Sequence, residues 1–194
     1  MNTPNKITLF RIFLVPVIMI IAAIDKLDFI LFYNLTCKNL IILILFLIAS
    51  FSDFLDGYIA RKKNLITNFG KFADPLADKI LVISVLIILL VQGTLLKSFV
   101  VSIIIIRELA VTGVRLLAAQ KNKVIAAGWL GKIKTNLQFI LIILLLINGR
   151  FTQIGVIEII IIVEMYLTLL FTVLSGVFYI IKNREVFKEE RKNE

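Results

Sequence analysis

Histidine is absent from the 194 residues of the chain, and Cys37 is its single cysteine. Without histidine, every catalytic triad or metal site that depends on an imidazole is excluded. One cysteine can form neither an intramolecular disulfide nor a cysteine-based zinc cluster. Any catalysis by this chain must therefore use carboxylates, lysines or hydroxyl groups.

Acidic residues are also few, because 13 Asp and Glu stand against 22 Lys and Arg, which gives a net charge of +9. A basic chain of this kind could indicate binding to nucleic acid. However, 60% of the residues are hydrophobic, compared with roughly 45–50% in an ordinary soluble domain. The composition therefore argues against a water-soluble domain and against a nucleic-acid partner.

Six apolar segments approach the length of about 20 residues that a helix needs to cross a bilayer. They cover residues 7–24, 39–60, 72–91, 96–118, 133–147 and 154–181. We therefore expect an all-α integral membrane protein with six transmembrane helices, which form a single domain over residues 1–194.

Basic residues in the connections and at the ends of these spans are distributed unequally over the two sides of the predicted membrane. Fourteen lie on the side that holds both chain ends, whereas only four lie on the other side. Because basic loops are retained in the cytoplasm, both termini are predicted to be cytoplasmic. The basic tail, residues 182–194, is explained most simply as a solvated helix end that is attracted to anionic lipid.

Four aspartates lie within the predicted spans, where an ionisable side chain is costly and marks a candidate functional site. Asp53 and Asp56 lie near the cytoplasmic end of the second span, and Asp74 and Asp78 near the start of the third. Spacings of three and four residues place each pair on one face of its helix. The short connection makes these helices antiparallel neighbours, so we expect the four carboxylates to share one site.

Four neighbouring carboxylates remain ionised in a low-dielectric site only if cations compensate them. Since histidine and cysteine ligands are lacking, the all-oxygen set suits Mg²⁺ or Mn²⁺. Such sets typically hold two metal ions that stabilise a phosphoryl group during in-line displacement. Two alternatives remain open: the aspartates are interfacial caps, as the Asp74-Pro75 pair suggests, or they mark the path of a divalent-cation transporter.

The same aspartates belong to a longer pattern, D-x-x-D-G-x-x-A-R-x8-G-x3-D-x3-D, over residues 53–78. This pattern resembles the signature of the CDP-alcohol phosphatidyltransferase family, whose members transfer the phosphatidyl group of a CDP-linked lipid to an alcohol and release CMP. The resemblance implies a homodimer in which the four aspartates hold two divalent cations and Asp78 is also the general base. It further implies that the CDP-lipid is bound by Asp56, Gly57, Ala60, Arg61 and Gly70. Without the pattern, Gly57 and Ala60 could equally serve close helix packing, and Arg61 could extend to the interface.

Other segments resemble one group within this family, the phosphatidylglycerophosphate synthases. These segments contain Asn2, Pro4, Asn5, Thr8, Arg11 and Pro16, then residues 106–109 with Arg115, and finally residues 131–135 with Gln138. The resemblance implies that CDP-diacylglycerol donates the phosphatidyl group, that sn-glycerol 3-phosphate accepts it, and that the product is phosphatidylglycerophosphate. It also favours a bacterial cell membrane, with the inner membrane of an organelle as the alternative, and a polar active-site cavity open to the cytoplasm.

The basic residues of the spans support an anionic acceptor without the resemblance, because a phosphate dianion would compensate their charge. The candidate phosphate-binding residues are Arg107, Arg115, Lys132 and Lys134, together with Thr8 and Arg11 from the first span. Structural alternatives remain: an Arg107–Glu108 ion pair, arginines that extend to the interface, and lysines that only follow the positive-inside rule. Inositol phosphate, phosphatidylglycerol and serine remain alternative acceptors, and inositol phosphate offers the same phosphate group.

Overall fold

The computed structural model describes the backbone of residues 3–32, 34–63, 68–120, 125, 128–149 and 155–187. Side chains are described for residues 9–32, 34–52, 76–77, 79–119, 125, 128–149 and 155–187. The chain divides into two compact units, of which the first contains residues 1–96 and 142–158 and the second contains residues 97–141 and 159–194.

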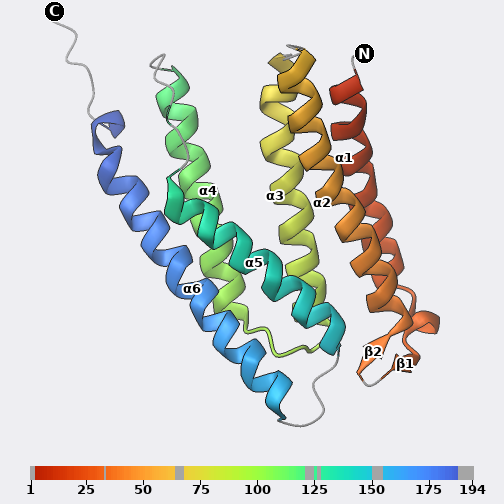
Figure 1. The fold of residues 1–194 in the computed structure, drawn as a ribbon. Helices are drawn as coiled ribbons and strands as arrows, with labels where there is room; N and C mark the ends of the chain where they lie inside the picture. The colour runs from red at the N-terminus through yellow and green to blue at the C-terminus, as the bar shows by residue number, and fades with distance from the viewer. Residues whose placement is uncertain are drawn as a thin grey trace, which may run out of the picture. The chain divides into compact units, whose positions relative to one another are not determined.

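Six α-helices occur among the described residues, one at each predicted apolar segment (Figure 1). They are α1 (Thr3–Ala22), α2 (Cys37–Lys63), α3 (Asn68–Val91), α4 (Ser98–Gln120), α5 (Trp129–Asn148) and α6 (Val156–Lys182). Two short 3₁₀ helices, η1 (Asp25–Leu27) and η2 (Arg184–Phe187), follow α1 and α6. The prediction that all six segments are helical is confirmed.

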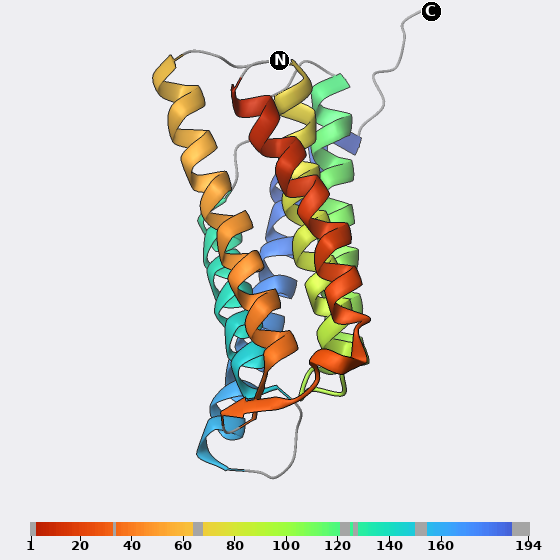
Figure 2. The ribbon, with the colours of Figure 1, turned by 90° about the vertical axis from the view of Figure 1, so that its right-hand side faces the viewer.

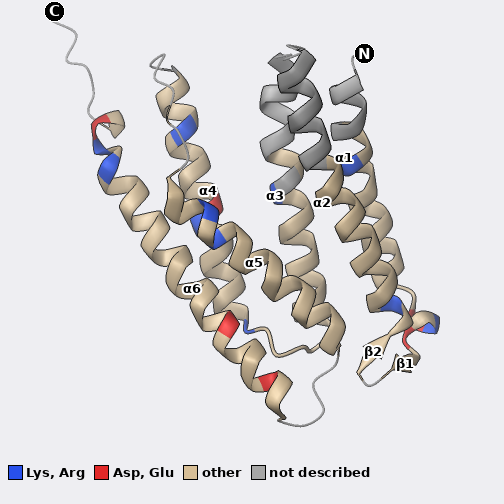
Figure 3. Cartoon of the chain, viewed as in Figure 1, with Lys and Arg blue, Asp and Glu red and all other residues tan. Residues whose placement is uncertain are grey.

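Two of these helices, α5 and α6, are long and apolar enough to cross a membrane. Large apolar side chains such as Val163, Leu170 and Phe178 are exposed along α6, and an exposed apolar helix face of this kind suits contact with lipid. Figure 3 shows long stretches of α5 and α6 that contain no Lys, Arg, Asp or Glu. The crossing of the bilayer by all six helices stays a prediction.

The first unit is built around α1, which contacts both α2 and α3; the three helices lie side by side in Figures 1 and 2. Ile42, Phe46 and Ala49 are fully buried, and their spacings of four and three residues place them on one side of α2. Val85 and Leu89 are buried in the same way on α3. The helix periodicity of the apolar residues thus positions the two helices that carry the aspartates.

A short antiparallel hairpin, β1 (Ile30–Phe32) and β2 (Leu35–Thr36), connects α1 to α2. The expectation of a purely α-helical chain therefore needs this small correction. Thr36, the last residue of the hairpin, directly precedes α2, and its Oγ1 accepts a hydrogen bond of 3.2 Å from the backbone N–H of Asn39. This is an N-terminal cap, which satisfies a backbone donor that the first helical turn leaves without a partner.

The second unit contains α4, the first part of α5, most of α6 and η2. One cluster of its buried side chains joins Val111 and Val114 of α4 to Tyr179 of α6, with Ile125 packed against it. Tyr179 brings a hydroxyl group into this apolar cluster, and a buried hydroxyl needs a hydrogen-bonding partner. That partner belongs to the candidate site.

Candidate functional site

The two aspartate pairs of the predicted metal site lie in helical backbone, as expected. Asp53 and Asp56 belong to the last turns of α2, and Asp74 and Asp78 to the first half of α3. Their spacings therefore place each pair on one side of its helix, and α2 contacts α3. The side chains of these aspartates lie outside the described residues, so the shared carboxylate site stays a prediction.

The predicted contacts of the CDP-lipid have the same outcome. Gly57, Ala60 and Arg61 lie in α2 and Gly70 lies in α3, so their backbone is helical, as predicted. The surroundings of these four residues lie outside the described part of the structure. The same holds for the side chain of Thr8 in α1, a predicted contact of the acceptor. Their roles stay predictions.

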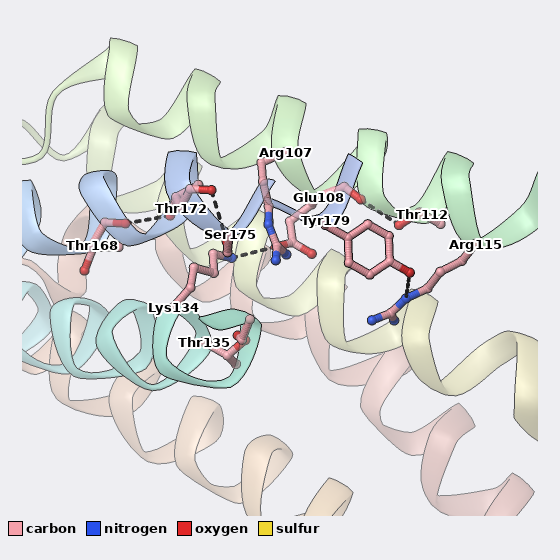
Figure 4. Close-up of polar contacts among 11 residues, drawn as sticks. Arg107, Glu108, Thr112, Arg115, Lys134, Thr135, Thr168, Thr172, Ser175 and Tyr179 are labelled. Carbon is pink, nitrogen blue, oxygen red and sulfur yellow. Dashed lines mark hydrogen bonds and ion pairs between the residues drawn. The ribbon is translucent and has the colours of Figure 1, made fainter. Parts of the chain in front are cut away.

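Three charged side chains of the second unit meet in the charge cluster, which we define as Arg107 and Glu108 of α4 with Lys134 of α5 (Figure 4). Glu108 Oε1 accepts hydrogen bonds from Arg107 Nη1 at 2.9 Å and from Lys134 Nζ at 2.6 Å. The side chains of Arg107, Glu108 and Lys134 are only 12%, 14% and 3% exposed, respectively. The ion pair between Arg107 and Glu108, one of the structural alternatives, is therefore present, and Lys134 extends it to a second helix.

Two of the three side chains in the charge cluster are cations, and both contact the carboxylate of Glu108. In addition, Arg107 Nε is buried and has no hydrogen-bonding partner among the described residues. Two neighbouring cations suit an anionic ligand, because phosphate accepts charge-assisted hydrogen bonds. The cluster can thus stabilise the helix pair and bind an anion at the same time.

Arg115, two turns beyond Arg107 on α4, is anchored differently. Its Nε donates a hydrogen bond of 3.2 Å to Tyr179 Oη, and its guanidinium carbon lies 5.7 Å from the centroid of the ring. Tyr179 was not singled out from the sequence, because its contact with Arg115 joins residues 64 positions apart. The arginine itself is exposed, so its guanidinium remains accessible to a ligand.

Lys132 and Arg11 differ in their exposure. Lys132 is exposed and lies two residues from Lys134, and residues two apart do not share a helix face. This position suits the alternative that Lys132 follows the positive-inside rule. Arg11 is 1% exposed and belongs to α1 of the first unit, so it does not extend to the surface, as one alternative assumed.

Several polar residues of α6 were not assigned by the sequence analysis. Glu158 is buried, and its Oε2 accepts a hydrogen bond of 2.8 Å from the backbone N–H of Gly155 at the start of the helix, which makes it a cap. Thr172 Oγ1 donates to the Thr168 carbonyl at 2.6 Å, and Ser175 Oγ to the Thr172 carbonyl at 3.1 Å (Figure 4). These bonds satisfy the hydroxyl donors locally, so α6 buries them at little cost.

The sequence as a whole matches a known family. The model of the CDP-alcohol phosphatidyltransferases matches residues 1–174. The chain therefore belongs to the CDP-alcohol phosphatidyltransferase family and is an enzyme of that class. The family predicted from residues 53–78 is thus confirmed, and the transporter alternative is not retained.

Individual relatives share one name, CDP-diacylglycerol–glycerol-3-phosphate 3-phosphatidyltransferase. The protein of this name from Bacillus subtilis (strain 168) is 47% identical over 199 residues, which cover 96% of this chain and 97% of the relative. The protein from Rickettsia typhi is 35% identical over 92% of this chain and 94% of its own length. The protein from Wigglesworthia glossinidia brevipalpis is 32% identical over 97% of this chain and 98% of its own length.

Proposed function

We propose that this enzyme transfers the phosphatidyl group of CDP-diacylglycerol to sn-glycerol 3-phosphate, with phosphatidylglycerophosphate and CMP as products. The observation that carries the proposal is the 47% identity, over 96% of the chain, to a relative named for this reaction. The reaction belongs to phospholipid biosynthesis. The bacterial sources of the relatives and the apolar helices α5 and α6 support a bacterial cell membrane as its location.

The charge cluster supports an acceptor that carries a phosphate group. Arg107 and Lys134 both contact the carboxylate of Glu108, and two neighbouring cations suit a phosphate dianion. Serine has no phosphate that these cations could bind. Inositol phosphate would bind the same cations, and the names of the relatives favour glycerol 3-phosphate over it.

We further propose that Asp53, Asp56, Asp74 and Asp78 hold two divalent cations, Mg²⁺ or Mn²⁺. The placement of both pairs on helices that contact each other supports this proposal, and a donor set made only of carboxylates suits hard cations. When bound, such cations would neutralise charge on the pyrophosphate of the CDP-lipid.

Within this proposal the residues of the chain have distinct tasks. Asp78 accepts the proton of the acceptor hydroxyl, whose oxygen forms a bond to the lipid-side phosphorus while the bond from that phosphorus to the CMP oxygen breaks. Arg107 and Lys134 hold the phosphate of the acceptor, and Arg115 assists from a position that Tyr179 fixes. Gly57, Ala60, Arg61 and Gly70 contact the CDP-lipid, as the family pattern implies.

The membrane arrangement belongs to the proposal as well. Six spans, cytoplasmic termini and a cavity open to the cytoplasm would leave the acyl chains of the donor in the bilayer while its headgroup meets a water-soluble acceptor. The homodimer implied by the family resemblance is also proposed. Cysteine-labelling of single-cysteine variants from both sides of the membrane would test the orientation, with Cys37 replaced by serine as the background.

Release of CMP by purified protein in detergent tests the function. CDP-diacylglycerol and Mg²⁺ are supplied with each candidate acceptor separately, and the lipid product is identified by mass spectrometry. Release with sn-glycerol 3-phosphate, and a product with the mass of phosphatidylglycerophosphate, is the expected result. Release with inositol phosphate or serine instead would overturn the proposed acceptor.

Asp78→Asn should abolish CMP release, whereas Asp25→Asn, a change at an exposed residue of η1, should not.

A further inference from the structure

Two glycines from different helices lie against the side chain of Arg107. A Cβ atom at Gly176 of α6 would lie 3.0 Å from Arg107 Cγ and 3.9 Å from Arg107 Cβ. A Cβ atom at Gly131 of α5 would lie 3.4 Å from Arg107 Nη2. Gly176 therefore borders the aliphatic part of the arginine, and Gly131 borders its guanidinium group.

The other end of Arg107 is also fixed. Nη1 donates to Glu108 Oε1 at 2.9 Å, and Lys134 holds the same oxygen at 2.6 Å. The arginine is therefore limited by α6 along its aliphatic part and by an ion pair at its tip. Nε is buried and has no hydrogen-bonding partner among the described residues.

We propose that Gly176 is a positioning residue for Arg107, because the lack of a side chain there lets the arginine pass close to α6 and places its guanidinium group for the phosphate of the acceptor. This inference rests on the proposed function, in which Arg107 binds that phosphate. Gly176 itself touches no substrate.

The expected effect of a methyl group at this position follows from the distances. Carbon atoms pack best at about 3.5–4.0 Å, so a Cβ atom 3.0 Å from Arg107 Cγ forces the arginine away from α6 by some tenths of an ångström. Hydrogen bonds between guanidinium and phosphate depend on close geometry. We expect Gly176→Ala to raise the KM for glycerol 3-phosphate by about tenfold, the loss of one good charge-assisted hydrogen bond, without a comparable change in kcat or in the KM for CDP-diacylglycerol.

Gly113→Ala is the matched control. Gly113 lies inside α4, and a Cβ atom there meets nothing within 4 Å among the described residues. Both substitutions replace glycine by a better helix former, so only Gly176→Ala changes the space around Arg107. The control should leave all kinetic constants unchanged. If Gly113→Ala raises the acceptor KM as much as Gly176→Ala does, the effect is not specific to Arg107 and the inference is wrong.

A double-mutant cycle with Arg107→Ala separates positioning from plain helix packing, since small residues also serve close packing between membrane helices. If Gly176 acts through Arg107, Gly176→Ala raises the acceptor KM in the wild-type background but not further in the Arg107→Ala background. An equal increase in both backgrounds would overturn the inference. An Arg107→Ala protein with a normal acceptor KM would instead contradict the proposed function, so the two failures are distinguishable.

Thermal unfolding of the wild type, Gly176→Ala, Arg107→Ala and the double variant covers the case in which Gly176→Ala folds poorly. If the methyl group clashes with Arg107, the loss of stability should disappear in the Gly176→Ala, Arg107→Ala double variant, which lacks Cγ. The same loss in both backgrounds would show that α6 requires glycine for another reason, and the positioning role would be rejected.

Discussion

Arg115 of α4 and Tyr179 of α6 are joined by a hydrogen bond of 3.2 Å from Nε to Oη, although 64 positions separate them in the sequence. The guanidinium carbon also lies 5.7 Å from the centroid of the ring. Tyr179 is itself held in place by Val111 and Val114, with which it forms a buried cluster. A rigid aromatic side chain thus orients a flexible arginine that is exposed and available to an anionic substrate.

Tyr179→Phe removes this hydrogen bond and retains the ring. We expect the KM for glycerol 3-phosphate to rise by about fivefold, equivalent to about 1 kcal/mol for one hydrogen bond, because Arg115 then samples more conformations. The free energy of unfolding should change little, since the ring keeps its packing. Steady-state rates of CMP release at varied acceptor concentration measure the effect.

Tyr166→Phe is the control, since Tyr166 lies on the same helix and is exposed. It should leave the acceptor KM unchanged. An unchanged KM in Tyr179→Phe as well would show that the contact with Tyr179 does not contribute to acceptor binding by Arg115.

Glu108→Ala should have its main effect on stability. The substitution removes the carboxylate that contacts both Arg107 Nη1 and Lys134 Nζ, and it leaves two buried cations near each other. Removal of one partner from a buried ion pair typically costs about 3–5 kcal/mol. Thermal unfolding in detergent should therefore show a large fall in the midpoint, and glycerol 3-phosphate should restore part of it, because the acceptor phosphate supplies negative charge.

The control for this prediction is Glu185→Ala, a change at an exposed residue of η2. An exposed carboxylate contributes little to stability, so this midpoint should move by no more than a degree or two. Equal shifts in the two variants would contradict the structural role of Glu108.

The sequence predicted the six helices because the length and periodicity of apolar segments are local properties. The ion pair of Arg107 with Glu108 could also be proposed from the sequence, since the two residues are adjacent. The hairpin at residues 30–36 escaped prediction because strands of three and two residues carry too little pattern.

The rest of the charge cluster could not be predicted from the sequence, because it depends on contacts between helices. Lys134 meets Glu108 across 26 positions, and no periodicity within one helix specifies such a pairing. Lys132 lies on the other side of α5 from Lys134, because residues two apart do not share a helix face. This could have been predicted if the start of α5 had been placed before Lys132. The close approach of Arg107 to Gly131 and Gly176 can be recognised only once the position of the Arg107 side chain is known.

Removal of divalent cations tests the proposed role of the four aspartates. EDTA should abolish CMP release, and addition of Mg²⁺ or Mn²⁺ should restore it, because uncompensated carboxylates would repel the pyrophosphate of the donor. Asp53→Asn should raise the cation concentration needed for half-maximal activity. Asp25→Asn is the control and should keep the wild-type cation dependence; full activity of the wild-type enzyme in EDTA would contradict the metal site.

The backbone at Gly149, directly after α5, gives a prediction about stability alone. Gly149 has a φ of +58°, and a Cβ atom there would collide with the backbone carbonyl oxygen of Asn34 and lie 3.5 Å from Asn39 Nδ2. Gly93, after α3, has a φ of +70°, but a Cβ atom there meets nothing within 4 Å among the described residues. Alanine at either position therefore costs about 1–2 kcal/mol for the left-handed conformation, and only Gly149→Ala adds a collision with backbone.

The two glycine variants can be compared directly because they share the conformational cost. Gly149→Ala should lower the midpoint of thermal unfolding clearly more than Gly93→Ala, since the carbonyl of Asn34 belongs to the hairpin and can move away only if the connection between α1 and α2 shifts. CMP release by the folded fraction should be normal in both variants, because neither glycine belongs to the proposed site. Equal midpoints would mean that the hairpin adapts without cost, and the close approach of residues 34 and 149 would then contribute nothing to stability.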